Sequence, residues 1–253
     1  MQQVRRRRCG PDPGDLGVSQ RLVLFDIDGT LHLSGGAGRR AIVKALEDEA
    51  GVDPGGANAV RFDGKTDPQI VLEMFSAVGR EDECDEARIE RVLARYLVHL
   101  ETDLAVNAAR ATVMPGVVPL LDSLRQDSRI VLGLLTGNVS RGAAIKLRAV
   151  GIDPDQFRVG AFGSDHAVRS SLPPIAVQRA ASMLGRSVAG PEVVIIGDTP
   201  ADVTCGQGIG AWSIGVATGS FSTDQLAAAG AHAVFSDLAD TAAVHSTIIG
   251  SLV

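Results

Sequence analysis

Cysteine is scarce in this chain. Its 253 residues include three, Cys9, Cys84 and Cys205, which lie far apart. Their spacing excludes the disulfide framework of a small secreted domain and the paired ligands of a cysteine zinc site. We therefore expect a protein of the reducing cytoplasm.

Positive charge and long apolar runs are also lacking. The net charge is −6, which gives the chain no general attraction for nucleic acid. No window is apolar over the length that a membrane helix requires. We therefore expect neither a nucleic-acid nor a membrane partner.

One basic run, Arg5–Arg8, goes against the overall charge. An export signal would continue into an apolar stretch, but glycine, proline and aspartate follow here. The run could contact nucleic acid or an anionic surface, or belong to a solvated leader. We prefer the second interpretation because no aromatic residues accompany the arginines, and we expect residues 1–20 to be a disordered leader.

Apolar residues, in contrast, make up 45% of the chain. Many of them fall in short runs, and these runs predict strands at residues 22–25, 130–135, 157–162, 193–196, 211–216 and 233–235. Helical patterns alternate with the later strands, at residues 115–124, 140–150 and 173–184. This alternation predicts an α/β fold with a doubly wound parallel sheet.

The stretch between the first two strands has a different pattern. It contains no strong strand signal, and its apolar spacings predict helices at residues 39–50, 68–78 and 83–104. We therefore expect a helical insertion at residues 33–111, with the sheet formed by residues 21–32 and 112–253.

Two carboxylates end the first strand. Asp26 and Asp28 follow its apolar run directly, and side chains two residues apart in an extended segment lie on the same side. Two like charges so close are costly unless a cation or a proton separates them. An ordinary Asp-Gly turn at a strand end is the alternative.

Two more strands end in polar clusters. Thr136, Gly137 and Asn138 follow the strand at 130–135, and Asp198 and Asp202 follow the strand at 193–196. The carboxyl ends of parallel strands share one edge of the sheet, so the three clusters should meet. Carboxylates without histidine or cysteine companions suit Mg²⁺, which would offset their repulsion and admit an anionic substrate.

Three motifs now give a resemblance. The segments DIDGT at 26–30, LLTGN at 134–138 and GDTPAD at 197–202, each after an apolar strand, resemble the haloacid dehalogenase-like (HAD) superfamily of phosphohydrolases. The resemblance extends over residues 21–238 and implies a Rossmann-like core. The insertion resembles the α-helical cap of the branch that contains phosphoglycolate phosphatase and β-phosphoglucomutase.

The resemblance implies roles for the acids. Asp26 would be the nucleophile that forms an aspartyl-phosphate and would also bind the metal. Asp28 would be the general acid and base, with its backbone carbonyl as a metal ligand. Asp198 would bind Mg²⁺, and Asp202 would help directly or through water.

The resemblance also implies phosphate-binding residues and a cation. Thr136, Gly137 and Asn138 would hold the phosphoryl group. For the cation that balances the nucleophile, Arg169 follows the third strand, and its planar fork suits phosphate oxygens. Lys146 is the alternative, but its place within a predicted helix favours a solvated face, so we predict Arg169.

The cap should select the substrate. Lys65, in a loop that the resemblance places over the active site, could contact a carboxylate or second phosphate of the substrate, or be an ordinary exposed lysine. Gly35 and Gly36 fit either a hinge or a flexible link. His32 could approach the substrate or be structural.

Together these features predict a Mg²⁺-dependent phosphatase that hydrolyses a small phosphomonoester, phosphoglycolate-like or a sugar phosphate, through an aspartyl-phosphate. A phosphosugar mutase of the same branch is the alternative. A haloacid dehalogenase is less favoured, because such enzymes need no Mg²⁺ and lack the second acid that Asp28 supplies. The four acids also argue against a catalytically silent binding protein. The expected partner is a small phosphate ester, and no oligomeric state is predicted.

Overall fold

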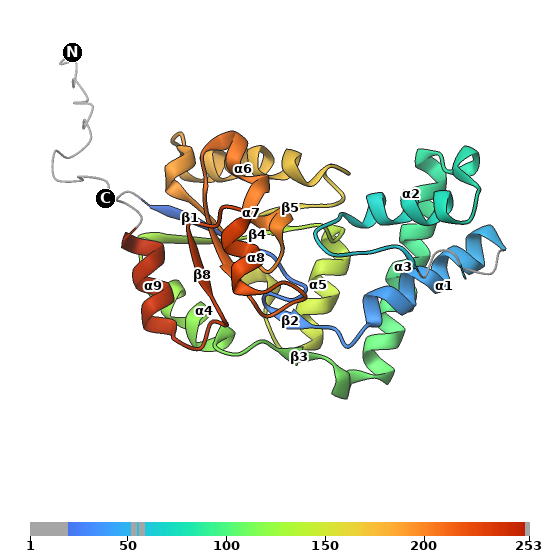
Figure 1. Ribbon diagram of the computed structural model, residues 1–253, viewed down its shortest axis with the longest axis horizontal. Coiled ribbons are helices and arrows are strands. Elements are labelled where there is room, and N and C mark those ends of the chain that lie inside the picture. Colours follow the sequence, from blue (N-terminus) through green and yellow to red (C-terminus); the bar gives the residue numbers. More distant parts are fainter. Residues whose placement is uncertain (1–19, 52–54, 56–58, 251–253) are drawn as a thin grey trace, which may run out of the picture.

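The computed structural model describes residues 20–51, 55 and 59–250. The predicted leader, apart from Gln20, lies outside these residues. Within them, six parallel strands form one sheet in the order β5-β4-β1-β6-β7-β8 (Figure 1). The strands are β1 (Arg21–Phe25), β4 (Ile130–Thr136), β5 (Val159–Phe162), β6 (Val193–Gly197), β7 (Trp212–Val216) and β8 (Ala233–Phe235). The predicted α/β class is confirmed.

The central strand β1 is buried on both faces because its neighbours β4 and β6 are covered by helices on either side. Val23 and Phe25 belong to the hydrophobic cluster under α4 (Val117–Gln126), α5 (Ser140–Ala149) and α9 (Thr241–Gly250). Leu22 and Leu24 belong to the cluster under α6 (Leu172–Leu184) and α7 (Pro200–Cys205). Successive side chains of β1 thus enter hydrophobic clusters on opposite faces of the sheet, which explains why this strand is apolar throughout.

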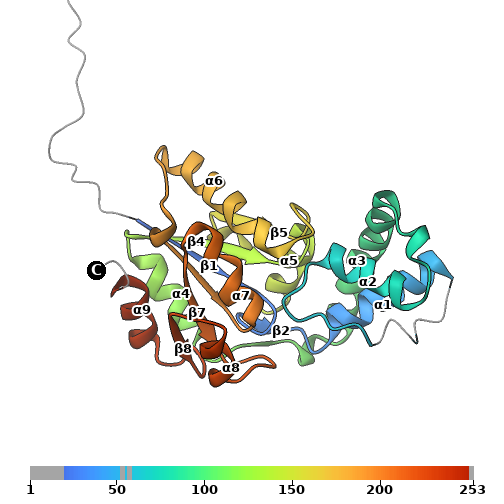
Figure 2. The ribbon, with the colours of Figure 1, turned by 45° about the horizontal axis from the view of Figure 1, so that its top comes forward.

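The insertion leaves and rejoins the core through a short antiparallel pair, β2 (His32–Leu33) and β3 (Thr112–Val113). Between them lie α1 (Ala37–Ala50), α2 (Asp67–Ala77) and α3 (Glu86–Val106), grouped at one side of the sheet in both views (Figures 1 and 2). These helices surround a hydrophobic cluster of their own, which includes Ile42, Leu46, Met74, Phe75, Tyr96 and Leu100.

Capping side chains fix where two of these helices begin. Thr66 accepts a hydrogen bond from the backbone N–H of Gln69 at the start of α2. Asp85 accepts one from the N–H of Arg88, so α3 begins at Glu86 rather than at the predicted residue 83. The residues just before Asp85 form a 3₁₀ turn instead.

The remaining elements are short. Helix α8 (Thr223–Ala228) packs against β7 and β8. Turns of 3₁₀ helix occupy Glu81–Glu83, Ala108–Arg110, Pro154–Gln156, Arg169–Ser171, Gly190–Glu192 and Gln207–Ile209. Among the helices that the structure describes, none has the length and apolar character needed to cross a membrane.

Candidate active site

A cavity of about 220 Å³ lies at the carboxyl edge of the sheet. The core contributes the ends of β1, β4 and β6 to its wall, and the insertion contributes residues of α1, α2, α3 and the loop before α2. The three polar clusters predicted from the sequence do meet there: Asp26, Asp28, Thr136, Gly137, Asn138 and Asp198 all line the cavity.

The end of β1 turns sharply to expose its acids to this cavity. The N–H of Asp26 still donates to Ile196 of β6 (2.9 Å), whereas the N–H of Leu31 donates back to Ile27 (2.9 Å). Gly29 permits the turn with a φ of 84°. Because a Cβ at Gly29 would lie 2.4 Å from Asp198 Oδ2, glycine also lets the β1 turn approach the β6 acid.

Three buried carboxylates gather on the β1 and β6 side of the site. Asp26, Asp198 and Asp202 each offer an oxygen, and these oxygens lie within 4.8 Å of one another. Asp198 Oδ1 accepts a hydrogen bond from the hydroxyl of Thr30 (3.1 Å). Asp202 Oδ2 accepts from the N–H (3.0 Å) and hydroxyl (2.6 Å) of Thr199, which caps α7.

The carboxylates of this trio are costly to ionise together. Burial raises the pKa of Asp26 to about 7, with the charges of Asp202 and Asp28 adding to the rise. Burial likewise raises the pKa of Asp198 to about 9, with Asp202 and Asp26 adding to it. All donors are hard oxygens, so the trio fits a divalent cation such as Mg²⁺, which would favour the ionised forms.

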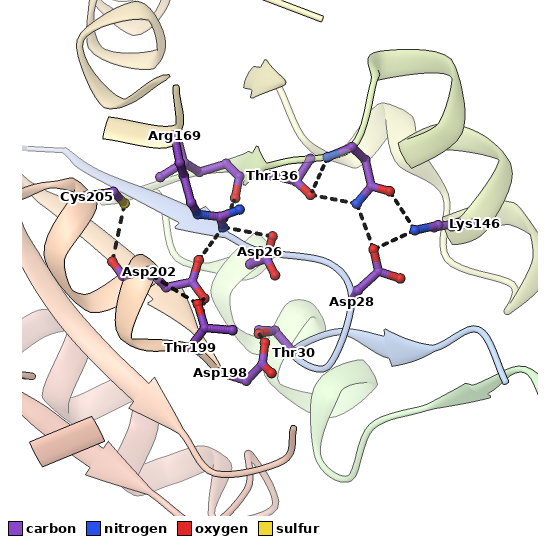
Figure 3. A network of polar contacts seen from close by, with 12 residues as sticks. Asp26, Asp28, Thr30, Thr136, Lys146, Arg169, Asp198, Thr199, Asp202 and Cys205 are labelled. Atoms are coloured by element: carbon purple, nitrogen blue, oxygen red, sulfur yellow. Dashed lines mark hydrogen bonds and ion pairs between the residues drawn. The ribbon is translucent and has the colours of Figure 1, made fainter. Parts of the chain in front are cut away.

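Arg169 lies against the trio, as Figure 3 shows. Its Nη2 is 3.1 Å from Asp26 Oδ1 and also forms an ion pair with Asp202 Oδ1. Burial acts to lower the pKa of Arg169, but the charges of Asp202 and Asp26 outweigh it and raise that pKa above its ordinary value. The structure thus places Arg169 beside Asp26, where the sequence predicted the balancing cation.

Lys146 requires a correction. The prediction of a solvated lysine is wrong: its Nζ is buried and lies 2.6 Å from both Asp28 Oδ2 and Asn138 Oδ1. Helix α5 is covered on two sides, because Ala143 packs into the sheet cluster and Ile145 packs against the cluster of the insertion. A helix pattern read without the insertion in place therefore mistakes this side of α5 for a solvent face.

The contact with Lys146 gives Asp28 a different pKa and a different orientation from Asp26, the other acid of the first motif. Burial acts to raise the pKa of Asp28, but the charge of Lys146, together with His32 and the hydrogen bonds from Lys146 and Asn138, brings this pKa below its ordinary value. The Asp28 side chain is 41% exposed, on the side that faces the cavity. Figure 3 shows it turned toward Lys146, away from the trio. The metal group among the described residues accordingly does not include the Asp28 side chain.

The second motif is hydrogen-bonded to Asp28. The side-chain amide of Asn138 donates to Asp28 Oδ2 and to Thr136 Oγ1, both at 2.8 Å. The backbone N–H of Asn138 also donates to Thr136 Oγ1 (3.3 Å). The amide predicted to hold phosphate thus contacts Asp28 and Lys146 in this structure, while the hydroxyl proton of Thr136 can still be directed into the cavity.

The loop before α2 is bonded to the core. The N–H of Asp67 donates to Gly137 O (2.7 Å), and Asp67 Oδ2 accepts from the N–H of Val139 (2.8 Å). Thr66 Oγ1 donates to Ala167 O (2.6 Å). A Cβ on Gly137 would lie 1.9 Å from Lys65 O, so glycine is required where this loop meets the second motif.

Lys65 and His32 occupy different kinds of place. Lys65 lines the cavity, and its ammonium group forms an ion pair with Glu73 of α2. His32 is fully buried in β2 and is not among the residues that line the cavity. Burial lowers the pKa of His32, so that the ring is held neutral.

Sequence reasoning missed contributors from a fourth strand end. After β7, the hydroxyl of Thr218 donates to Gly29 O (2.5 Å). A Cβ on Gly219 would lie 1.8 Å from Asp198 Oδ2. The signal was the glycine that follows the predicted strand at 211–216. Tyr96 and Asp67 also reach the cavity from the insertion, without any sequence pattern that separates them from core residues.

The fold and the site define an α/β enzyme with an acidic centre at the carboxyl edge of its sheet. The family model of the haloacid dehalogenase-like hydrolases matches residues 20–210, and the chain belongs to this family. It is an HAD-type phosphatase, as the three motifs indicated.

Individual relatives agree with this assignment. A phosphoglycolate phosphatase of Rhodospirillum rubrum is 30% identical over 222 residues, which cover 87% of this chain and 88% of the relative. A phosphoglycolate phosphatase of Pseudomonas putida is 28% identical over 209 residues, 80% and 71% of the two chains. The solved structure of a β-phosphoglucomutase from Clostridium difficile matches with a TM-score of 0.66 at 16% identity, over 91% of this chain and 98% of that one. The last likeness concerns the fold alone.

Proposed function

We propose that the protein is a Mg²⁺-dependent phosphatase that hydrolyses a small phosphomonoester of the phosphoglycolate type. The observation that carries the proposal is the trio of buried carboxylates with Arg169 against it. The names of the two curated relatives support the substrate class. A cavity of about 220 Å³ favours a small ester, since pockets for drug-sized ligands are typically about 300–1,000 Å³.

Asp26 is the proposed nucleophile. Its carboxylate oxygen attacks phosphorus and forms an aspartyl-phosphate, while the bond from phosphorus to the ester oxygen breaks. The departing alkoxide takes a proton from the carboxyl group of Asp28. In the second step Asp28 accepts a proton from water, whose oxygen attacks the same phosphorus and releases inorganic phosphate and Asp26.

The other core residues hold the phosphoryl group. Arg169 lies beside Asp26 and would bind the transferring oxygens through its planar fork. The Thr136 hydroxyl and the N–H of Gly137 would donate to the same group. When bound by Asp26, Asp198, Asp202 and the backbone carbonyl of Asp28, Mg²⁺ supplies positive charge between an anionic nucleophile and an anionic substrate.

We propose that residues 33–111 act as a cap over this chemistry. Their helices have a hydrophobic cluster of their own, and the loop at Thr66 and Asp67 bonds directly to core loops. Closure by such a segment excludes water while the aspartyl-phosphate forms. Gly35 and Gly36, both at positive φ beside the β2–β3 pair, are the proposed hinge.

The test is a screen of phosphomonoesters with Mg²⁺ or with a chelator, run beside the Asp26→Asn variant. We expect turnover that requires Mg²⁺ and falls by about 10³-fold or more in the variant. Phosphate release distinguishes a phosphatase from a mutase, which would return an isomeric sugar phosphate. Undiminished turnover in Asp26→Asn would rule out the assigned nucleophile.

A further inference from the structure

Lys146 is a buried cation at the cavity wall that the proposed mechanism does not use. Its Nζ forms an ion pair with Asp28 Oδ2. Bulk water does not screen this pair strongly, because Lys146 is only 5% exposed. Nζ also donates a hydrogen bond to Asn138 Oδ1. Gly38 of α1 lines the cavity close to this group, because a Cβ there would lie 3.3 Å from Nζ.

Its position relative to the reaction is unusual. Figure 3 shows Arg169 and Lys146 on opposite sides of the site, with Asp28 between Asp26 and Lys146. A phosphoryl group held by Asp26 and Arg169 with its ester oxygen at Asp28 directs the leaving group toward Lys146. The first positive charge that the leaving group meets beyond Asp28 is therefore the ammonium group of this lysine.

The other cations of the cavity wall have different surroundings. Arg169 is engaged by two carboxylates of the trio. Lys65, whose side chain is 25% exposed, pairs with Glu73. Arg39 donates to Val60 O (2.9 Å) and lies over the ring of Phe62 (3.9 Å). Only Lys146, among these four described residues, contacts the proposed proton-transfer acid.

We propose that Lys146 is a specificity-determining residue that binds a carboxylate of the leaving group, one carbon away from the ester oxygen. This inference rests on the proposed function. A general acid lies about 2.6–3.2 Å from the atom it protonates, and in a –O–CH₂–COO⁻ group the ester and carboxylate oxygens are roughly 3 Å apart from bond lengths of about 1.2–1.5 Å. Since Nζ is 2.6 Å from Asp28 Oδ2, one such group reaches both residues.

Charge and space favour a carboxylate over a larger anion. Substrate binding would add a second anion to Lys146 and turn its pair with Asp28 into a shared contact, which frees Asp28 to face the ester oxygen. Helix α1 approaches Nζ closely at Gly38, and the whole cavity has a volume of about 220 Å³, so the ammonium group can be reached by a small anion only. A carboxylate at this point completes two charge-assisted hydrogen bonds without the bulk of a second phosphate.

The test compares 2-phosphoglycolate with 2-hydroxyethyl phosphate, which has a similar length and no carboxylate. In the unchanged protein we expect kcat/KM to be at least tenfold higher for 2-phosphoglycolate. In Lys146→Met this ratio should fall by about 10- to 100-fold, the range for a charge-assisted hydrogen bond. Lys44→Met is the matched control, because Lys44 pairs with Glu47 and Asp48 on the outer surface of α1; its ratio should equal that of the unchanged protein.

The outcomes separate the two proposals. Equal loss of both esters in folded Lys146→Met would overturn the inference, since the lysine would then act through Asp28 alone. A ratio near one in the unchanged protein would also overturn it, even if the variant fails to fold, while leaving the proposed phosphatase intact. If neither these esters nor any other in the Mg²⁺ screen is hydrolysed, the proposed function itself fails.

Discussion

Two aspartates of one short motif acquire opposite properties from their surroundings. Asp26 is 6% exposed within an acidic trio, and burial raises its pKa to about 7. Asp28 lies two residues further, and the charge of Lys146 with the hydrogen bonds from Lys146 and Asn138 lowers its pKa in spite of burial. Two identical side chains of one motif therefore titrate differently, because one lies in a buried acidic trio and the other lies against an ammonium group.

The raised pKa values predict how stability depends on pH without metal. Asp26 and Asp198 have pKa values of about 7 and about 9, well above the ordinary value near 4. The unfolded chain therefore ionises these acids first, and their contribution to the free energy of unfolding should decrease from about pH 4 to about pH 9. Asp28, whose pKa is lowered, acts in the opposite sense and below that window.

Asp198→Asn should therefore stabilise the metal-free protein at pH 8, by at least about 1 kcal/mol or roughly 2–4 °C in Tm. The variant should also show a shallower decrease of stability between pH 5 and pH 9, and it should gain little from Mg²⁺. Urea unfolding in a chelator across this pH range measures the effect. Identical pH dependence in the two proteins would contradict the assigned cost of ionising the trio.

At the scale of elements, the site depends on loops that follow strands and on one loop of the insertion that touches them. The backbone at Gly137 is the contact point, because the carbonyl of Lys65 lies where a Cβ would be. The N–H of Asp67 donates to the carbonyl of the same glycine. The loop before α2 and the second motif are thus fitted to each other through backbone atoms.

Gly137→Ala should separate these two loops. A Cβ 1.9 Å from Lys65 O cannot be accommodated without movement of one backbone, so we expect KM to rise and amide hydrogen exchange to speed up at residues 65–67. Gly208→Ala is the control, because a Cβ there meets nothing within 4 Å. Unchanged exchange in Gly137→Ala would show that the contact does not hold the loop.

The sequence was sufficient to predict the six strands of the sheet, because runs such as Leu22–Phe25 are apolar on both faces. It did not predict β2 and β3, whose two residues each are too few for a periodic pattern. The acids of the trio were recognisable because strand ends meet at one edge. The burial of Lys146 was not, since it depends on a helix of the insertion that packs over α5.

At the scale of the whole molecule, the sheet and the insertion have separate hydrophobic clusters, and the candidate active site lies where they meet. Figures 1 and 2 show the helices of the insertion at one side of the sheet. A destabilising substitution in one cluster should therefore increase local unfolding around that cluster and leave the other one protected.

Leu100→Ala tests this separation. Leu100 is fully buried in the cluster of the insertion. The void left by the shorter side chain should lower the free energy of unfolding by about 2–5 kcal/mol. We expect faster hydrogen exchange in α1 and α3 and a loss of activity, with β1 and β4 still protected. Leu120→Ala, in the cluster under the sheet, should instead speed up the hydrogen exchange of the strands. Uniform exchange in both variants would mean that the molecule unfolds as one unit.

The β2–β3 pair has an evolutionary consequence. His32 pairs with Val113 and Leu33 with Thr112, so the chain departs from the core and returns at neighbouring points only about 5 Å apart. To the sheet, the whole insertion is equivalent to the tip of a hairpin. A segment of another length could be joined at the same two points without stretching the strands of the sheet, so all the residues that the insertion contributes to the cavity can change by exchange of one continuous stretch of gene.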